Sequence, residues 1–201
     1  MALLEKMFNR LGHLLLRGAQ LTRVLFYWCI STNSVTGKPS RHQPLQRVGA
    51  GEIHMDNDVG IGFFPSPFFL STYAHLEARN PSAIIRIGSG TWLNNNFCAI
   101  AEHTSISIGR NCLIGANVEL LDSDFHGLAV KDRCKSLPEW AKPIVICNNV
   151  FIGSNVKVLK GVTIWDGSII ANGSVVTTYV PSGVIAGGNP AMVIRAIDQN
   201  G

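Results

Sequence analysis

The residues with the clearest chemical potential stand in one short run, Asp122-Ser123-Asp124-Phe125-His126. Because imidazole titrates near neutral pH, His126 can take a proton from a hydroxyl as that hydroxyl attacks an electrophile. Asp124 lies close enough in the sequence to orient or polarise the ring. By itself the run allows a general base at His126, although a lone histidine in a surface loop is more often simply solvated.

The segment after His126 is rich in charge and contains the candidate substrate-binding residues Lys131, Arg133, Lys135 and Trp140. Its three clustered cations have only Asp132 among them. Such a cluster would attract an acidic sugar, or the diphosphate of a nucleotide- or lipid-linked sugar. The alternative is a loop that its charges keep soluble.

The other histidines and the cysteines predict neither a metal site nor disulfides. His54, His75 and His103 have no companion at metal-ligand spacing. The five cysteines are odd in number and lack C-x-x-C spacing. We therefore interpret them as reduced residues that fill the core.

A strict repeat must position these residues. From about residue 84, aliphatic residues return every six positions, which is typical of short flat strands joined by tight turns. Three-strand coils stacked at about 4.8 Å would bury them, so the sequence predicts an all-β solenoid. A loop insertion at 121–144 interrupts the repeat and adds nothing to a core, which indicates a functional loop. The inward positions are Ile87, Leu93, Ala99, Ile108, Ile114, Leu120, Ile146, Ile152, Val158, Ile164, Ile170 and Val176.

Two runs carry a family resemblance: Ile146-Cys-Asn-Asn-Val-Phe-Ile152-Gly-Ser-Asn-Val-Lys-Val158 and Ile185-Ala-Gly-Gly-Asn-Pro190. They resemble the hexapeptide-repeat acyltransferases, and the resemblance covers roughly residues 48–197. It implies a left-handed parallel β-helix that assembles as a homotrimer and uses acetyl-CoA as the acetyl donor. It also places the catalytic histidine at the start of the loop insertion, where His126 stands.

The asparagines before that loop gain a role from the same resemblance. Asn95 corresponds to the asparagine that holds the acceptor hydroxyl in sugar acetyltransferases, and Asn94 and Asn96 flank it. A turn ladder is the alternative, because asparagine tolerates left-handed turns. Together with Glu77-Ala-Arg79 and the run ending at His126, these residues are similar to the bacterial polysaccharide O-acetyltransferases.

The resemblance also implies an acetyl-CoA site along the last coils, between two subunits. The implied residues are Phe151, Ser154, Asn172, Gly173, Thr177 and Arg195. The family often has a tryptophan where Phe151 stands, a lysine where Thr178 stands and an arginine where Met192 stands. The grip on the phosphates is therefore expected to differ, with Lys157 or Lys160 as substitutes.

The N-terminal region has a different character. Residues 1–32 are expected to form an amphipathic helix over 2–28, residues 33–47 a linker, and residues 48–201 the β-helix domain. The first 50 residues carry seven Lys or Arg against one acid, Glu5, while the whole chain has a net charge of +4. Such a helix suits an anionic membrane surface, and the alternative is docking on its own solenoid or on a trimer mate.

The composition excludes several classes of protein. No apolar run approaches the ~20 residues of a membrane span, and Lys6, Arg10 and Arg17 interrupt any signal-peptide core. The body shows no basic stripe with stacking aromatics, so a nucleic-acid partner is not expected. We expect a cytoplasmic protein with peripheral contact at the inner membrane.

The function predicted from these features is acetyl transfer from acetyl-CoA to a hydroxyl of a cell-envelope sugar or polysaccharide precursor. His126 would be the general base. The alternatives are an amino-sugar N-acetyltransferase, because the same base would deprotonate an ammonium, and a non-catalytic β-helix scaffold in an envelope-glycan complex.

Overall fold

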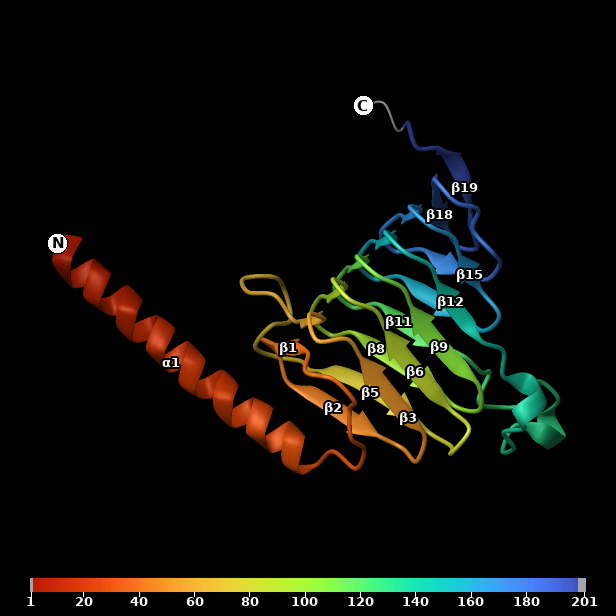
Figure 1. The fold of residues 1–201 in the computed structure, drawn as a ribbon, viewed down its shortest axis with the longest axis horizontal. Coiled ribbons are helices and arrows are strands. Elements are labelled where there is room, and N and C mark those ends of the chain that lie inside the picture. The colour runs from red at the N-terminus through yellow and green to blue at the C-terminus, as the bar shows by residue number, and fades with distance from the viewer. Residues whose placement is uncertain (1, 199–201) are drawn as a thin grey trace.

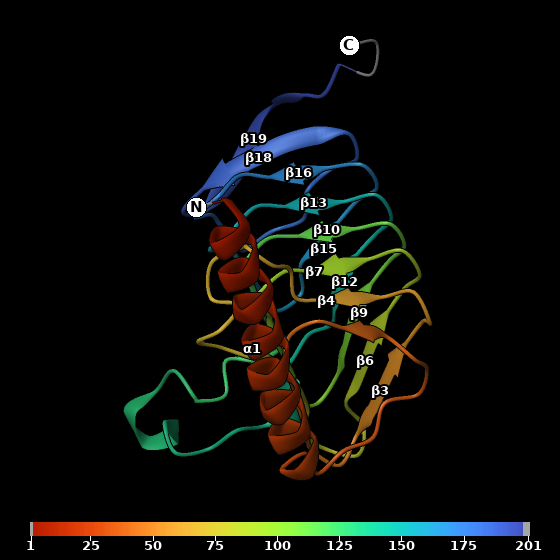
Figure 2. The same cartoon turned by 90° about the vertical axis from the view of Figure 1, so that its left-hand side faces the viewer.

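The structure, a computed structural model, describes residues 2–198 and is mostly β (Figure 1). A long helix, α1 (Ala2–Cys29), precedes a stack of coils that rises from the first strands to the C-terminus. In the view of Figure 2, α1 runs in front of the stack and a loop of the later chain projects to one side.

Three sheets make up the coils, and successive strands enter them in turn. The first sheet contains β1 (Ser40–Arg41), β4 (Gly60–Ile61), β7 (Trp92–Leu93), β10 (Leu113–Ile114), β13 (Phe151–Ile152), β16 (Ile169–Ile170), β18 (Val184–Gly188) and β19 (Ala191–Ala196). The second contains β2 (Leu45–Val48), β5 (Ala74–Ala78), β8 (Cys98–Ala101), β11 (Glu119–Leu121), β14 (Lys157–Leu159) and β17 (Val175–Val176). The third contains β3 (Glu52–Met55), β6 (Ile84–Ile87), β9 (Ser105–Ile108), β12 (Ile144–Ile146) and β15 (Thr163–Ile164). The strands of these sheets pair in parallel, except that the last strand, β19, runs antiparallel to β18.

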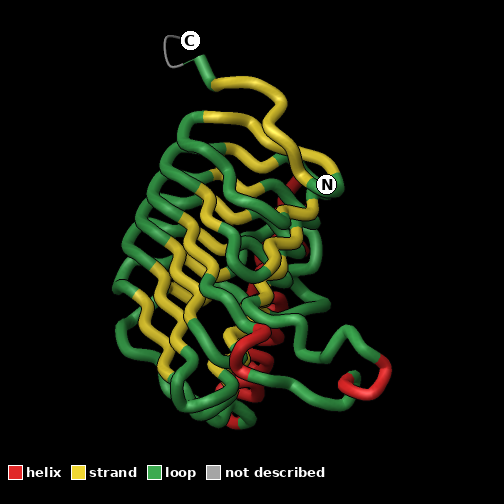
Figure 3. The backbone as a smooth tube through the Cα atoms, turned by 90° about the vertical axis from the view of Figure 1, so that its right-hand side faces the viewer, coloured by secondary structure: helices red, strands yellow, loops and turns green. Residues whose placement is uncertain are grey.

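The six-residue repeat sets the register of these sheets. In the third sheet Ile87 pairs with Ile108, Ile108 with Ile146, and Ile146 with Ile164. All four side chains are buried in one continuous core. The second sheet stacks Ala99, Leu120, Val158 and Val176 in the same way. The parallel β architecture predicted from the repeat is thus confirmed, and Figure 3 shows the coils edge-on.

Left-handed turns close the corners between the first and second sheets. Asn96, Asn117 and Asn155 have φ of 60°, 58° and 60°, the region in which asparagine is tolerated better than most residues. Their side chains form a ladder, because Asn96 donates to Asn117 at 2.7 Å and Asn117 donates to Asn155 at 2.8 Å. Asn96, expected beside an acceptor, therefore belongs to a turn ladder.

The segment expected as a linker, 33–47, is part of the first coil. It contains β1 and most of β2, and Gln43 within it is fully buried. The Gln43 amide donates to the carbonyl oxygen of Phe68 at 3.0 Å and to Thr72 Oγ1 at 3.1 Å. The polar Gln43 of this segment therefore makes its hydrogen bonds with a neighbouring loop rather than with solvent.

The C-terminal half of α1 docks on this first coil. Gln20 donates to the carbonyl oxygen of His42 at 3.1 Å, and Arg23 donates to that of Phe69 at 3.1 Å. Tyr27 stacks on Tyr73 with ring centroids 4.4 Å apart. Beyond Gln20 toward the N-terminus, the helix leaves large apolar side chains exposed: Met7, Phe8, Leu11, Leu14 and Leu15.

Candidate active site

His126 lies in the longest excursion of the described coils, between β11 and β12. The excursion includes two short 3-10 turns, Val130–Asp132 and Pro138–Trp140, and projects from the stack (Figure 3). Nδ1 of His126 lies 2.6 Å from the carbonyl oxygen of Arg133. Since a carbonyl only accepts, Nδ1 carries the proton and Nε2 of the neutral ring keeps its lone pair. An exposed imidazole in this tautomer can act as a base.

Asp122 fixes the start of this loop to the coil. Its side chain is fully buried and accepts hydrogen bonds from the backbone N–H groups of Glu102 at 2.7 Å and Thr104 at 2.9 Å. The Thr104 hydroxyl donates to it as well, at 2.8 Å. Asp122 is thus an anchor, and this role could be found only by knowing that residues 102–104 turn beside it.

Asp124, which was expected to orient or polarise His126, pairs with a lysine instead. Its carboxylate accepts a hydrogen bond from Lys160 Nζ at 2.5 Å, and Lys160 also donates to the carbonyl oxygen of Trp140 at 2.7 Å. The contact that orients His126 comes from the backbone of Arg133 instead. Lys160, considered for the cofactor phosphates, is committed to closing the loop onto β14.

The candidate acceptor-binding cations occupy the outer part of the loop. Lys131 and Arg133 are exposed, and Lys135 pairs with Asp132 at 2.7 Å. Trp140 is half-buried at the return of the loop, beside Gly127. A Cβ at Gly127 would come within 2.5 Å of Asp132 Cβ and 2.8 Å of the Trp140 ring, so the loop closes only over a glycine.

A cavity of about 610 Å³ opens beside His126. It is lined by Leu121, Phe125, His126, Leu128, Arg133 and Leu159, among others. The lining also includes the carboxylate of Asp124, which Lys160 pairs. Apolar side chains beside one base and one guanidinium can hold a sugar ring and an anionic substituent together.

Asn95 has a different position from the one expected. Its side chain is fully buried, and its amide donates to the carbonyl oxygens of Phe63 at 2.9 Å, Ser66 at 3.1 Å and Pro67 at 2.8 Å. Its oxygen accepts the N–H of Phe63 at 3.0 Å. Because these contacts use every donor of the amide, Asn95 holds the loop of residues 63–69, called here the aromatic loop, in place within this chain. Its two prolines lack N–H groups, so the carbonyl oxygens of the loop need a donor from elsewhere.

Asn95 and His126 also lie beyond opposite ends of the strands in the second sheet. Asn95 is at the corner before β8, whereas His126 comes after β11, the strand that pairs with β8. Four strand residues at about 3.3 Å each put roughly 13 Å between the two ends. One chain alone therefore does not bring these two side chains together.

A second cavity, of about 390 Å³, lies on the outer face of the first sheet. Phe151 lines it with Trp92, Leu113 and Phe63, and Asn94 is among its lining residues. A mostly apolar cavity that includes one amide suits the pantetheine arm of coenzyme A.

The other residues implied for the cofactor fall into two groups. Ser154, Asn172 and Gly173 meet at one corner, where the Ser154 N–H donates to Asn172 at 2.8 Å and the Gly173 N–H to the Ser154 carbonyl oxygen at 2.9 Å. Gly173, with φ of 72°, has open space where a side chain would stand. Thr177 is exposed beyond β17, at the opposite corner, and Arg195 is exposed on β19. The structure thus brings Ser154, Asn172 and Gly173 together and leaves Thr177 apart from them.

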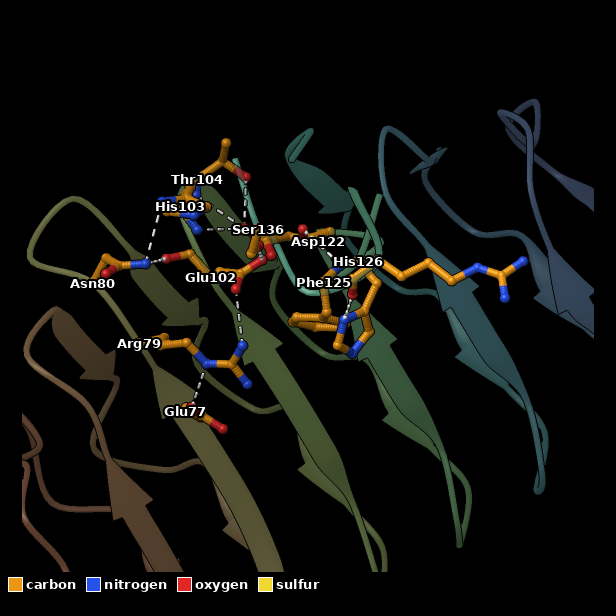
Figure 4. Close-up of polar contacts among 12 residues, drawn as sticks. Glu77, Arg79, Asn80, Glu102, His103, Thr104, Asp122, Phe125, His126 and Ser136 are labelled. Atoms are coloured by element: carbon orange, nitrogen blue, oxygen red, sulfur yellow. Dashed lines mark hydrogen bonds and ion pairs between the residues drawn. The ribbon is translucent and has the colours of Figure 1, made fainter. Parts of the chain in front are cut away.

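Sequence reasoning missed a polar cluster beside the histidine loop (Figure 4). Arg79 pairs with Glu77 at 2.7 Å and with Glu102 at 2.9 Å, and its guanidinium lies 4.9 Å from the ring centroid of Phe125. Ser136, at the far end of the loop, donates to Glu102 at 2.7 Å. Glu77 and Arg79 stand two residues apart at the end of β5, a spacing that puts both side chains on the same side of extended backbone. This spacing was visible in the sequence.

The charges of this cluster shift its pKa values. Burial raises the pKa of Glu102, but hydrogen bonds from Ser123, Ser136 and Arg79 outweigh it and leave the pKa below the usual 4.5. Burial likewise opposes the hydrogen bonds of Arg79 and His75 at Glu77, whose pKa is also lowered. The hydrogen bond from Arg79 to Glu77 raises the pKa of the guanidinium. All three groups are therefore charged at neutral pH.

The cysteines and histidines offer no second centre within the described chain. Burial raises the pKa of Cys98 to about 12, so that thiol stays protonated. Over residues 2–198, no three His, Cys, Asp or Glu side chains gather as a metal ion would require. Nor does any helix in that range have the length and apolarity to cross a bilayer.

Comparison with protein families places the repeat among known ones. The family described as bacterial transferase hexapeptide (six repeats) matches residues 143–178. The family described as hexapeptide repeat of succinyl-transferase matches residues 105–135. The second match includes His126 and the first half of its excursion, and the first match begins where the chain returns to the coils.

Similar proteins share most of the coiled region. The galactoside O-acetyltransferase of Escherichia coli is 41% identical over 57% of this chain and 55% of its own length. A polysialic acid O-acetyltransferase of Escherichia coli is 38% identical over 60% of this chain and 38% of its own length. The matches cover 54 to 59% of the length of the first curated relatives.

A solved structure agrees over nearly the whole chain. A hexapeptide-repeat acetyltransferase from Vibrio cholerae, complexed with acetyl coenzyme A, has a TM-score of 0.55 and 25% identity. The alignment covers 92% of this chain and 88% of that one.

Proposed function

Because the chain belongs to the hexapeptide-repeat acetyltransferase family, we propose that it transfers an acetyl group from acetyl-CoA to a hydroxyl of a cell-envelope sugar or of a polysaccharide precursor. The observation that carries this proposal is the tautomer of His126, whose Nδ1 contact with Arg133 leaves Nε2 free to take the proton of the acceptor hydroxyl. The fold proposed with it is a left-handed β-helix.

Acetyl-CoA would supply the activated acetyl thioester. The cavity beside Phe151 would hold its pantetheine arm, and the corner of Ser154, Asn172 and Gly173 would offer polar groups next to it. Arg195 and Thr177 would reach toward its phosphates, where the fork of a guanidinium suits a phosphate group. The fit of the apolar cavity and the open Gly173 supports this placement.

The acceptor is proposed to be a glycan because the relatives named for galactoside and polysialic acid are sugar O-acetyltransferases. Lys131, Arg133 and Lys135 would favour an acidic sugar or a diphosphate-linked one. Lys135 is already paired with Asp132, so Arg133 and Lys131 carry most of this preference.

A homotrimer is proposed as the assembled form. Asn94 precedes β8 and His126 follows β11, so they lie beyond opposite ends of paired strands, and a neighbouring copy would bring the corner at Asn94 toward His126. Light scattering at micromolar concentration should give three times the chain mass of 21.8 kDa. A monomer under these conditions would contradict the trimer.

Peripheral membrane contact is proposed for the N-terminal half of α1. Residues 6–51 contain seven Lys or Arg and no Asp or Glu, and the exposed face carries Phe8, Leu11, Leu14 and Leu15. An apolar face with basic flanks binds anionic lipid surfaces, which would place the protein at the inner membrane.

The test is acetyl transfer with purified protein, acetyl-CoA and a panel of acceptors. The panel should pair neutral, acidic and diphosphate-linked sugars, with products identified by mass spectrometry. We expect O-acetylation that falls with added salt for the anionic acceptors. Acetylation of amino-sugar nitrogens alone would replace the proposal with N-acetyl transfer. Binding of glycans without any turnover would replace it with a scaffold.

A further inference from the structure

We propose that Arg79 is a positioning residue that sets the orientation of His126 through the ring of Phe125. This inference rests on the proposed function, because it assigns Arg79 a role in the same site. Arg79 would act from a different strand and an earlier coil, and it would touch neither the acceptor nor acetyl-CoA.

Arg79 is the centre of a cluster that spans two coils. It stands one residue beyond β5, and its Nε donates to Glu77 at 2.7 Å while Nη1 donates to Glu102 at 2.9 Å. Glu102 follows β8, the strand that pairs with β5. The Glu102 side chain is only 4% exposed, so this carboxylate is held in one place by its partners. The two contacts hold the plane of the guanidinium and leave one face of it toward the histidine loop.

That face covers Phe125, the residue directly before His126 (Figure 4). The guanidinium carbon lies 4.9 Å from the ring centroid, within the range of a cation–π contact. Phe125 has φ of 59°, a left-handed conformation that a large side chain adopts only where its surroundings require it. The direction in which the backbone presents His126 therefore depends on where the Phe125 ring is held.

The same cluster also holds the far end of the loop. Ser136 donates to the second carboxylate oxygen of Glu102 at 2.7 Å, while Arg79 bonds the first. Between Phe125 and Ser136 the carbonyl oxygen of Arg133 accepts the His126 Nδ1 proton. Glu102 and Arg79 thus fix both sides of the His126–Arg133 contact.

This role is separate from stability of the fold. The aliphatic ladders lie inside the coils, and the Arg79 side chain is 39% exposed outside them. The Arg79–Glu77 pair is partly exposed, and Glu102 keeps its hydrogen bond from Ser136 when Arg79 is replaced, so the loss of stability should be limited. Small displacements of a catalytic group, in contrast, cost much in rate. We therefore expect substitutions at Arg79 to change the site more than they change folding.

The experiment compares Arg79→Gln, Arg79→Lys and Phe125→Tyr with the control Arg86→Gln, an exposed arginine on β6. We expect Arg79→Gln to lower kcat about tenfold or more with the KM for acetyl-CoA unchanged. Phe125→Tyr keeps the aromatic face and should retain most activity. Arg79→Lys keeps the charge but loses the planar fork of the guanidinium, so this variant should retain only part of the activity. The control should match the unchanged protein.

A double-mutant cycle with Phe125→Leu decides whether Arg79 acts through the ring. The proposal requires that Arg79→Gln combined with Phe125→Leu be no slower than the worse single variant. Rate losses that multiply, or full activity in Arg79→Gln, would overturn it.

A readout without turnover separates this inference from the proposed function. Nitrogen-15 NMR of the His126 ring in the unmodified protein should show the Nδ1-protonated tautomer, and Arg79→Gln should shift the ring toward a mixture. Should the protein transfer no acetyl group, this shift would still support the positioning role. An unchanged tautomer together with an unchanged melting temperature would refute it.

Discussion

Nδ1 of His126 and the carbonyl oxygen of Arg133 lie 2.6 Å apart, although seven residues separate them along the loop. This contact makes the loop itself the partner that orients the imidazole. Many bases are oriented by a carboxylate, and Asp124 was the expected one, but that side chain faces Lys160. A neutral carbonyl fixes the tautomer without adding a charge beside the base.

Replacement of His126 tests the proposed base directly. His126→Ala should lower kcat by about 10²–10⁴, the usual contribution of a positioned base, while the fold and acetyl-CoA binding remain. Steady-state kinetics and calorimetric titration with acetyl-CoA measure the two effects. Turnover at the original rate in this variant would remove His126 from the mechanism.

Asp122 should matter for folding more than for catalysis. Asp122→Ala removes an acceptor from three backbone N–H groups and one hydroxyl. We expect the free energy of unfolding to fall by about 3 kcal/mol, because buried donors lose a charged acceptor. Asp124→Ala, which breaks one exposed ion pair, is the matched control and should cost at most about 1 kcal/mol. Equal losses in urea denaturation would contradict the anchor role of Asp122.

Asn95 should control the aromatic loop. Asn95→Leu leaves three carbonyls of residues 63–67 without their donor, so the loop should open and become sensitive to proteolysis. Limited proteolysis with chymotrypsin, which can cut after Phe63, Phe68 and Phe69, measures this. Asn94→Ala serves as the control and should keep the loop protected. A protected loop in Asn95→Leu, with a raised KM for the acceptor, would instead favour the acceptor role.

The exposed face of α1 should bind anionic vesicles. Changing Leu11→Asp and Leu14→Asp together should abolish flotation with vesicles that contain phosphatidylglycerol, because both side chains are exposed and apolar. Leu70→Asp, at an exposed leucine on the body, should leave flotation unchanged. Unaltered binding of the double variant would count against membrane contact through the helix and favour docking between copies.

Stability should decline at acidic pH through Glu77 and Glu102. Both have a pKa below 4.5 in the folded protein, so they contribute stability above that value and lose it as the pH falls through the lowered pKa. The melting temperature should therefore drop below about pH 4.5. Glu102→Gln removes one of these groups and should flatten that drop, whereas Glu52→Gln, an exposed control, should not. If the melting temperatures of the two variants fall in parallel at acidic pH, Glu102 does not contribute to this loss of stability.

The sequence was sufficient for the repetitive part of the fold. A period of six with one inward aliphatic residue leaves few alternatives, and the inward positions Ile108, Ile146 and Ile164 are the ones that pair. The loop excursion was equally clear, because a break in a strict repeat is visible without any structure. The linker expected at 33–47 was wrong, because that segment contributes two short strands whose residues do not follow the repeat.

The candidate site depended on contacts across coils. The sequence by itself determined that His126 sits on a loop outside a parallel β stack, because hydrophobic periodicity is local. Only the tertiary structure decided that Arg133 orients it, that Asp122 is an anchor, and that Arg79 lies against Phe125. Hydrogen bonds and ion pairs join residues one coil apart, which lie about 18 to 23 positions apart along the chain, or 36 to 38 where the excursion intervenes. Stacking alone sets which of them meet.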